Sequence, residues 1–132
     1  MSLFIDHVVI TVNDLDKSIK FYTEVLGMEL QEFISNPDNI KRKSLKFGNQ
    51  KINLHENIKP FKPHAKNPTP GSMDICFVSD KSLGEWLNAL KKLCVNIEEG
   101  PVLKTGANSP IESIYIRDPD NNLIEISNKI KQ

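Results

Sequence analysis

Apolar and polar positions along the chain predict the same order of elements twice. Residues 5–12 are dominated by Val and Ile, which favours a β-strand, and Asp14 follows at a position suited to a helix N-cap. Residues 72–79 repeat this plan halfway along the chain and again lead into a helical pattern. A repeated strand–helix unit predicts two similar halves whose faces are buried together, with a shared cleft between them.

The register between the two copies decides which residues correspond. With Asp14 placed on Asp80, His7 in the first strand corresponds to Met73 in the second. A regular strand then turns Met73 toward the open face and Asp74 toward the helix-covered, apolar face, where an unpaired carboxylate is costly. A one-residue slip or bulge turns Asp74 to the open face instead.

Both predicted helices carry apolar residues at helical spacing. The first is expected to begin after Asp14 and to stop at Gly27, and the second to begin at Ser79 or Asp80. The apolar positions are Leu15, Ile19, Tyr22 and Leu26 in the first helix and Leu83, Trp86, Leu87 and Leu90 in the second. Each helix is therefore expected to cover one face of a small sheet, which leaves the other face for function.

Short alternating runs predict further strands. Residues 44–47 and 51–55 flank a Gly-Asn turn, which is typical of a β-hairpin. Residues 113–117 and 123–127 are joined by a run of Asp, Pro and Asn with the chemistry of a tight turn. Both halves are therefore expected to have the order β-α-β-β-β.

These elements predict one domain built from two modules. Module one spans residues 4–57, a proline-rich linker spans 58–71, and module two spans 72–128. The predicted fold class is α+β, with two tandem βαβββ modules that form a curved mixed sheet around a cleft. At 132 residues the chain is long enough to bury a core without disulfides.

The composition narrows the class of partner. Seventeen basic and seventeen acidic residues balance, which argues against nucleic acid or an anionic membrane as partner. Cys76 and Cys94 do not form a C-x-x-C pattern, so we expect two reduced thiols. Neither a signal sequence nor an apolar run near the roughly 20 residues of a membrane span is recognisable. The expected location is cytoplasmic.

Several motifs resemble one family. Asp-His-Val-Val-Ile-Thr-Val-Asn-Asp-Leu (residues 6–15) and Arg-Asp-Pro-Asp-Asn-Asn-Leu-Ile-Glu-Ile (residues 117–126) resemble the vicinal oxygen chelate superfamily of glyoxalases, bleomycin resistance proteins and extradiol dioxygenases. Residues 47–56, 70–76 and 98–102 are similar to the subgroup of glyoxalase domain-containing protein five and its bacterial, virulence-associated relatives. This resemblance covers about the whole chain.

The resemblance implies a divalent metal (Zn, Ni, Mn or Fe) held by the first and last strands of each module. At those positions this chain offers His7 and Glu125, whose imidazole and carboxylate suit such ions, and also Asn53. The fourth position falls on Met73, a weak ligand where metal-dependent members have His. Either His55, two residues after Asn53 on the same face, or a slipped Asp74 would complete the site. We expect the set His7, His55 and Glu125, although a metal-free site remains open.

Other residues are expected on the open face of the sheets. Alternation places Tyr115 and Arg117 there, with Asn53 and Met73, as substrate-binding residues, and Lys46 is a further candidate. Arg117 is suited to a carboxylate or phosphate, unless it pairs with Asp118 or Asp120 at the rim. Residues 100–110 are expected to form a loop, of which 104–109 resembles a lid.

Three functions follow from the resemblance. The first is a metal-dependent lyase or isomerase, similar to lactoylglutathione lyase, that acts on a small molecule with vicinal oxygens and uses Glu125 as the catalytic proton carrier. The alternative is a metal-free binding or resistance protein with a pocket lined by Met73, Phe77 and Tyr115. An extradiol dioxygenase ranks last, since it requires His55 to replace the missing histidine. We expect a homodimer, because the sheets leave edges that a second copy can cover.

Overall fold

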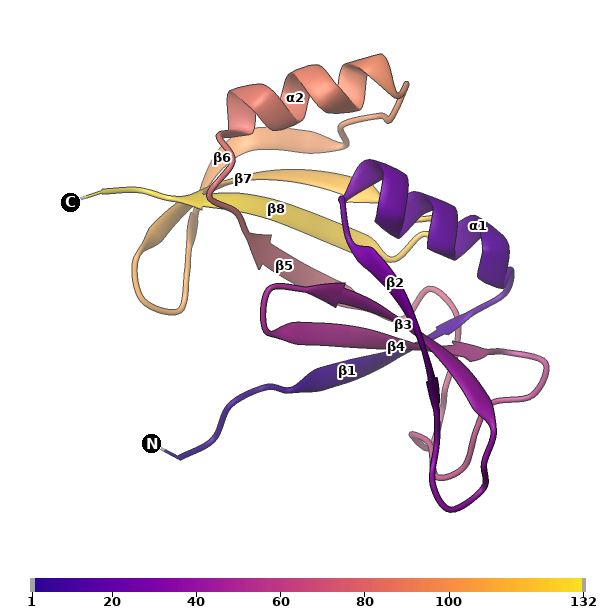
Figure 1. The fold of residues 1–132 in the computed structure, drawn as a ribbon. Helices are drawn as coiled ribbons and strands as arrows, with labels where there is room; N and C mark the ends of the chain where they lie inside the picture. Colours follow the sequence, from indigo (N-terminus) through magenta and orange to yellow (C-terminus); the bar gives the residue numbers. More distant parts are fainter. Residues whose placement is uncertain (1, 132) are drawn as a thin grey trace. The chain divides into compact units, whose positions relative to one another are not determined.

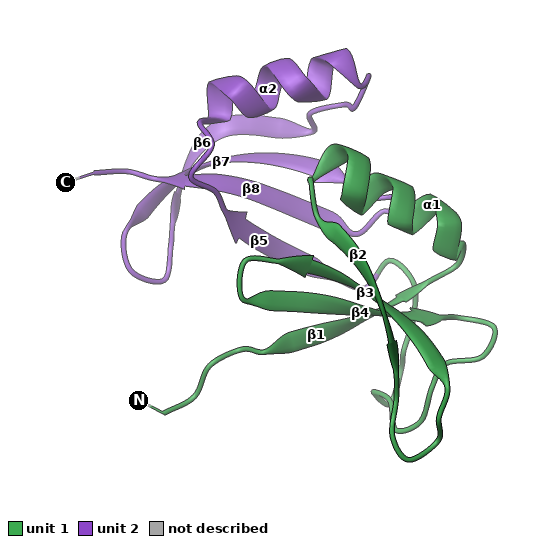
Figure 2. Cartoon of the chain, viewed as in Figure 1, with its two compact units in different colours: residues 1–71 green, residues 72–132 purple. Residues whose placement is uncertain are grey.

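The computed structural model describes residues 2–131 and divides the chain into two compact units, residues 1–71 and 72–132 (Figures 1 and 2). Each unit runs strand, helix and three further strands, so the predicted α+β class with two βαβββ modules is confirmed. Neither helix has the length and apolar character needed to cross a membrane within the described part of the chain.

Unit 1 forms a four-stranded mixed sheet in the order β1-β4-β3-β2. Strand β1 runs parallel to β4, while β3 is antiparallel to both β4 and β2. Its elements are β1 (His7–Val12), α1 (Leu15–Lys20), the π-helical turn η1 (Phe21–Val25), β2 (Glu29–Ile34), β3 (Lys41–Phe47) and β4 (Gln50–Glu56).

Unit 2 repeats this topology in the order β5-β8-β7-β6, with β5 parallel to β8. Its elements are β5 (Asp74–Val78), α2 (Leu83–Lys92), β6 (Glu99–Thr105), β7 (Pro110–Arg117) and β8 (Leu123–Lys129). The two sheets therefore place equivalent strands, β4 and β8, next to the first strand of their own unit.

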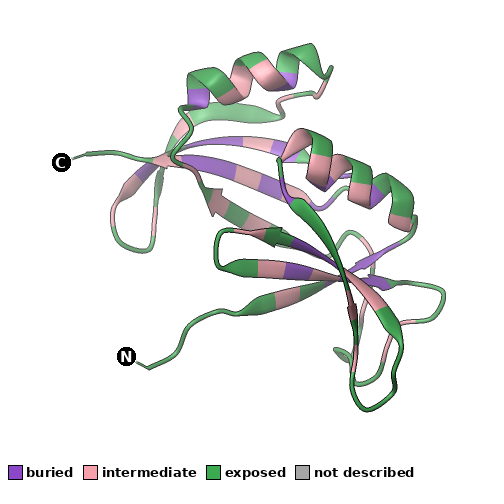
Figure 3. Ribbon diagram, viewed as in Figure 1, coloured by how far each residue is buried: buried purple, intermediate pink, exposed green. Residues whose placement is uncertain are grey.

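One face of each sheet is apolar and buried. In unit 2 this face carries Ile114 and Ile116 of β7 and Ile124 and Ile126 of β8, all at most 1% exposed. Burial is concentrated on β7 and β8, whereas β5 remains largely accessible (Figure 3). In unit 1 the corresponding residues are Ile10, Val12, Leu45, Ile52 and Leu54. Because strand residues alternate between faces, the intervening polar residues share the opposite face.

The first helix begins and ends as predicted, while the second begins later. Asp14 caps α1 by accepting a hydrogen bond from the Lys17 N–H at 3.1 Å, and Gly27 follows η1 with a φ of +75°. The prediction of Ser79 or Asp80 as the second cap is wrong, since Ser82 accepts from the Glu85 N–H at 3.2 Å. Ser79 instead accepts a hydrogen bond from the Trp86 indole at 2.9 Å.

The predicted loop 100–110 is mostly strand. Residues 99–105 form β6 and pair with β7, and only 106–109 connect the two strands, closed by the Gly106 N–H to Ser109 C=O bond at 2.9 Å. A lid over 104–109 is therefore wrong. The glycine and proline that suggested a loop mark a bulge: Gly100 has a φ of +105°, and a Cβ there would collide with the Ser113 carbonyl.

Candidate functional site

Three rows of residues lie side by side across the strands on the polar face of unit 2. Strand pairing places Glu125 of β8 between Tyr115 of β7 and Cys76 of β5. The neighbouring rows are Ser113, Ser127 and Val78 on one side and Arg117, Leu123 and Asp74 on the other. Tyr115, Arg117, Glu125 and Ser127 thus share the face on which alternation predicted them.

Glu125 is anchored by a chain of hydroxyl groups. The Ser113 hydroxyl donates to Glu125 Oε2 at 2.6 Å, and the Ser127 Oγ lies 2.6 Å from Ser113 Oγ. Cys76 Sγ lies 3.2 Å from Ser127 Oγ. All contacts are satisfied if thiol, Ser127 and Ser113 each donate to the next group, which ends on the carboxylate. Both serines are fully buried, whereas Glu125 is half-buried, so the chain holds a reachable carboxylate in one orientation.

Two groups beside Glu125 resist losing their protons. Burial, followed by the charge of Glu125 and a hydrogen bond with it, raises the pKa of Tyr115 to about 12. Burial is also the main reason why the pKa of the Cys76 thiol is raised, with the Glu125 charge acting in the same direction and the Ser127 hydrogen bond against it. Tyr115 is therefore a hydrogen-bond donor at neutral pH, and Cys76 is a poor nucleophile.

Of the two registers predicted for Met73 and Asp74, the regular one is wrong and the one-residue slip agrees with the strand pairing. Asp74, not Met73, lies two residues before Cys76 on the polar face, opposite Leu123 of β8. His7 lies two residues before Val9, which pairs with Asn53 of β4. Asp74 lies two residues before Cys76, which pairs with Glu125 of β8. Asp74 is therefore the residue of unit 2 that corresponds to His7. A carboxylate on this face needs no partner in the apolar core, which removes the cost that the regular register implied.

A buried clasp fixes this register. The Asn122 Oδ1 accepts the Met73 N–H at 2.8 Å, and its Nδ2 donates to Asp118 Oδ2 at 2.8 Å. Asp118 Oδ1 in turn accepts the N–H groups of Asp120 and Asn122, both at 2.9 Å. Asn122 and Asp118 are 1% and 4% exposed, so the turn before β8 holds the start of β5.

Arg117 is already engaged within unit 2. Its Nε and Nη2 donate to the two carboxylate oxygens of Glu98 at 3.0 and 2.9 Å, and its Nη1 donates to the Asn121 carbonyl at 3.1 Å. The rim pairing expected with Asp118 or Asp120 therefore forms with Glu98 instead. This bidentate pair occupies the guanidinium face that a ligand carboxylate would need.

The polar face of unit 1 also has three rows. The first row is Glu29, Lys46, Lys51 and His7, the middle row is Gln31, Ser44, Asn53 and Val9, and the third row contains Phe33, Arg42, His55 and Thr11. His7, Asn53 and His55 therefore share the face that the sequence predicted, together with Lys46. Unlike its counterpart in unit 2, this face presents three cationic side chains on β3 and β4.

His55 is covered by the segment that follows β4. Its ring packs edge-on against Phe61 with centroids 5.3 Å apart, and the Arg42 guanidinium lies 4.1 Å from the centre of the same ring. His55 is only 5% exposed. Burial lowers the pKa of His55, with smaller contributions from the positive charges of Arg42 and His64. The imidazole is thus neutral at pH 7.

The expected metal set does not fit the strand register. His7 lies opposite Lys51 and His55 opposite Thr11, so the two histidines are four residues apart along their strands, or roughly 13 Å. His7 Nδ1 contacts Asp6 Oδ2 at 2.8 Å, while His55 packs on Phe61. Across residues 2–131, no three His, Cys, Asp or Glu side chains gather as metal ligands do. One ion bound at about 2 Å therefore cannot take both imidazoles as they stand.

Sequence reasoning missed two contributors to these faces. Cys76 was read as a strand residue only, although the alternation that places Asp74 on the polar face places Cys76 there as well. Arg42 was not recognised, because its strand begins before the alternating run at residues 44–47. Lys43 pairs with Leu54, so Arg42 and His55 are the next residues along β3 and β4, and both contact the Phe61 ring.

Comparison with known proteins identifies similar chains. A family model described as Glyoxalase/Bleomycin resistance protein/Dioxygenase superfamily matches residues 4–126. Virulence protein STM3117 of Salmonella typhimurium is 50% identical over 123 residues, which cover 93% of this chain and 82% of that protein. Glyoxalase domain-containing protein RDO1 of Mycosarcoma maydis is 51% identical over 93% of this chain and 66% of its own length.

Solved structures agree with the fold. The crystal structure of Virulence protein STM3117 has a TM-score of 0.91 at 47% identity, covering 98% of this chain and 99% of that one. Lactoylglutathione lyase from Agrobacterium tumefaciens and the antibiotic binding protein TnmS3 from Streptomyces have TM-scores of 0.69 and 0.72 at 23% and 19% identity, over at least 94% of each chain. At that identity these two support the fold alone.

Proposed function

Because the chain belongs to the glyoxalase/bleomycin resistance protein/dioxygenase superfamily, we propose that it is a lyase or isomerase acting on a small molecule with vicinal oxygens. Glu125 is the proposed proton carrier. The observation that carries this proposal is the carboxylate itself: half-buried, set between Tyr115 and Cys76, and oriented by a 2.6 Å bond from the buried Ser113 hydroxyl.

The hydrogen-bond geometry suits proton transfer. Ser113 and Ser127 both approach Oε2 of Glu125, at 2.6 and 3.4 Å, which leaves Oε1 for a substrate C–H or for the Tyr115 hydroxyl. A carboxylate can remove the proton from a carbon next to a carbonyl group, so that the C–H electron pair forms an enediolate, and can then return the proton to the former carbonyl carbon. When a substrate takes the place of Tyr115 at Glu125, the Tyr115 hydroxyl, held protonated by its high pKa, can donate instead to the oxygen on which negative charge develops.

The divalent metal implied by the superfamily remains a proposal without a fitting ligand set. His7, His55 and Glu125 do not form one, because the strand register separates the two histidines. The dioxygenase alternative therefore loses the two-histidine, one-carboxylate arrangement on which it depended. Asp74 shares the face of Glu125. In unit 2 it is the candidate for the ligand position on the first strand that the superfamily implies.

A second candidate function is metal-free binding of a small molecule. The separation of His7 from His55 favours it, since binding needs no such ligand set. Met73 is not part of the pocket lining for this function, because it lies outside β5 and off the row of Tyr115 and Glu125.

One experiment separates the two candidates. Tag-free protein is assayed with the methylglyoxal–glutathione hemithioacetal by thioester absorbance, alongside Glu125→Gln and metal analysis by plasma mass spectrometry. The lyase proposal expects turnover that falls on the order of 100-fold or more in Glu125→Gln while ligand binding persists. Saturable binding of the hemithioacetal without turnover, unchanged by a chelator, supports the binding protein instead. Equal turnover in both proteins contradicts the role of Glu125.

A further inference from the structure

Buried polar atoms without partners gather on the polar face of unit 1. Four buried side-chain atoms there make no hydrogen bond within the described residues: Arg42 Nε, Ser44 Oγ, Asn53 Oδ1 and His55 Nδ1. These four residues occupy adjacent positions on β3 and β4. Ser44 is 1% exposed and His55 5% exposed. Because leaving a buried polar atom without a partner is unfavourable, such a cluster indicates groups that a ligand or another molecule satisfies.

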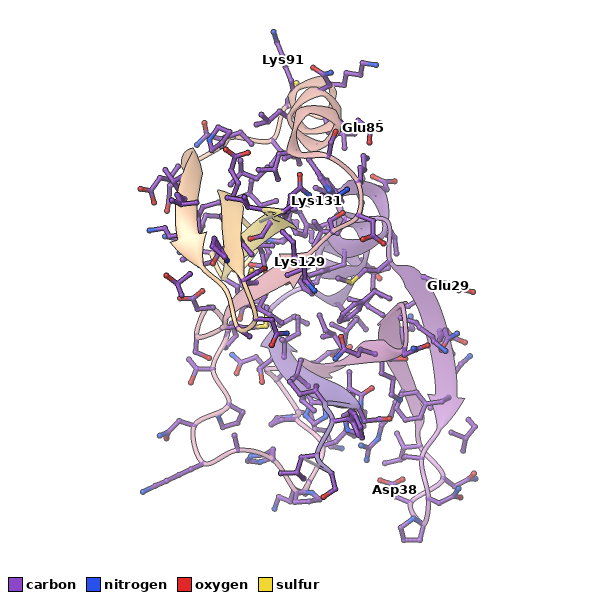
Figure 4. The ribbon with its side chains drawn as sticks, turned by 90° about the vertical axis from the view of Figure 1, so that its left-hand side faces the viewer. Glu29, Asp38, Glu85, Lys91, Lys129 and Lys131 are labelled. Carbon is purple, nitrogen blue, oxygen red and sulfur yellow. The ribbon has the colours of Figure 1, made fainter. Side chains whose placement is uncertain are left out.

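The charges on the same face indicate what that partner is. Lys46, Lys51 and Arg42 give this face of β3 and β4 three cationic side chains. Arg42 donates through Nη2 to Asp38 Oδ2 at 2.9 Å, which leaves its Nε–H for another acceptor. Glu29 lies beside Lys46 at the outer edge of the sheet and is labelled at the start of β2 in Figure 4. On β3 and β4 themselves this face carries no acidic side chain among the described residues.

The Lys51 side chain crosses the middle row. Its Nζ lies 4.1 Å from the centre of the Phe33 ring, although Lys51 belongs to the first row and Phe33 to the third. The ammonium therefore passes over the row formed by Ser44 and Asn53. Three hydrogen-bond donors are then available to one anionic group: the Lys51 ammonium, the Ser44 hydroxyl and the Arg42 Nε–H.

Asn53 adds a requirement that a plain anion cannot meet. Its Oδ1 only accepts hydrogen bonds, and it has no donor within residues 2–131. An oxyanion supplies acceptors alone. The matching ligand therefore carries an O–H or N–H group close to its anionic group, within the roughly 5 Å that separate opposite side chains on neighbouring strands.

We propose that the middle row of unit 1 is a recognition site for a small hydroxylated carboxylate or a similar organic anion. Lys51, Ser44 and the Arg42 Nε bind the anionic group, Asn53 accepts from the ligand hydroxyl, and Phe61 closes the row at His55. This inference rests on the proposed small-molecule function and names the chemistry of the ligand.

Chemical-shift titration of ¹⁵N-labelled protein tests the proposal with three probes at constant ionic strength: glycerate, propionate and glycerol. Glycerate carries both charge and hydroxyl, propionate only the charge, and glycerol only hydroxyls. We expect saturable shifts on β3 and β4 amides with glycerate, weaker ones with propionate and none with glycerol. Shifts spread over the molecule, or equal for glycerate and glycerol, would overturn the proposal.

Two variants assign the parts of the site. Lys51→Met is expected to weaken glycerate binding on the order of tenfold, and Asn53→Leu to remove the preference for glycerate over propionate while charge-driven binding persists. Lys91→Met is the matched control, since Lys91 projects from α2 in unit 2, away from any strand (Figure 4). An equal effect of Lys91→Met contradicts the site. Binding is read without turnover, so failure here leaves the role of Glu125 standing, and loss of activity in Glu125→Gln leaves this site standing.

Discussion

The polar faces of the two sheets have the same topology and opposite states of hydrogen bonding. In unit 2 the Ser113 hydroxyl, 0% exposed, is bonded at 2.6 Å to both Glu125 and Ser127. In unit 1 the Ser44 hydroxyl, 1% exposed, makes no hydrogen bond within the described part of the chain. The same topology thus carries hydrogen bonds to its own carboxylate in unit 2, whereas in unit 1 it leaves buried hydrogen-bonding groups without a partner among the described residues.

The comparison teaches how a duplicated module can divide a task. Preorganised hydrogen bonds fix the direction of a proton-transferring group before substrate arrives. A buried polar group without a hydrogen bond instead destabilises the free protein. A ligand that bonds to this group removes the cost, which favours binding of that ligand. Substitutions on each face test this division.

Removing the clasp should damage unit 2 most. Asn122→Ala deletes the bonds to the Met73 N–H and to Asp118, both 2.8 Å and both buried. We expect the free energy of unfolding to fall by about 2–4 kcal/mol in urea titrations. Asn88→Ala on the exposed surface of α2 serves as control and should change stability by less than about 0.5 kcal/mol. Equal values for the two variants would show that β5 is not held by this turn.

Tyr115 should titrate late because of its surroundings. Its pKa of about 12 exceeds the usual 10, so the folded protein holds this proton more tightly than the unfolded chain does. That contribution to stability is complete below pH 10 and is lost as the pH rises toward 12. Absorbance titration of the phenolate should detect this, and Glu125→Gln should move the titration to lower pH without reaching 10, since burial is the larger cause. A titration unmoved by the substitution argues against contact between the two side chains.

His55 offers the corresponding test in unit 1, with a smaller effect. Burial depresses its pKa below 6.5, so its contribution to stability is present above pH 6.5 and is lost as the pH falls below that value. Phe61→Ala removes the ring that packs on His55 and should raise the pKa of His55 toward 6.5. The ring signals of His55 in NMR report this change. An unchanged His55 titration would mean that Phe61 does not cover it.

The sequence predicts the fold closely because both signals on which it depends are local. Alternation along residues 51–55 and 113–117 settles which residues share a face, and Asp14 marks its helix start correctly. The regular register of β5 is one residue off, and the pattern alone did not decide between it and the slipped register that forms. That register is set by Asn122, 49 positions away from Met73, and no local pattern encodes such a contact.

The site was only partly predictable for the same reason. Tyr115 and Glu125 lie on neighbouring strands and follow from alternation, whereas the pairing of Arg117 with Glu98 depends on how β6 meets β7. His7 and His55 are on one face as predicted, but a shared face does not set the distance along it. Strand pairing supplies that distance and separates them.

The most direct test of the central claim compares Ser113→Ala with Ser44→Ala in urea unfolding. Both serines are buried strand residues on equivalent faces, so the substitutions remove the same atom from similar surroundings. We predict that Ser113→Ala lowers the free energy of unfolding by about 1–2 kcal/mol, because Glu125 and Ser127 lose a partner, while Ser44→Ala leaves it unchanged or raises it. Equal destabilisation by both substitutions would contradict the division of the two faces.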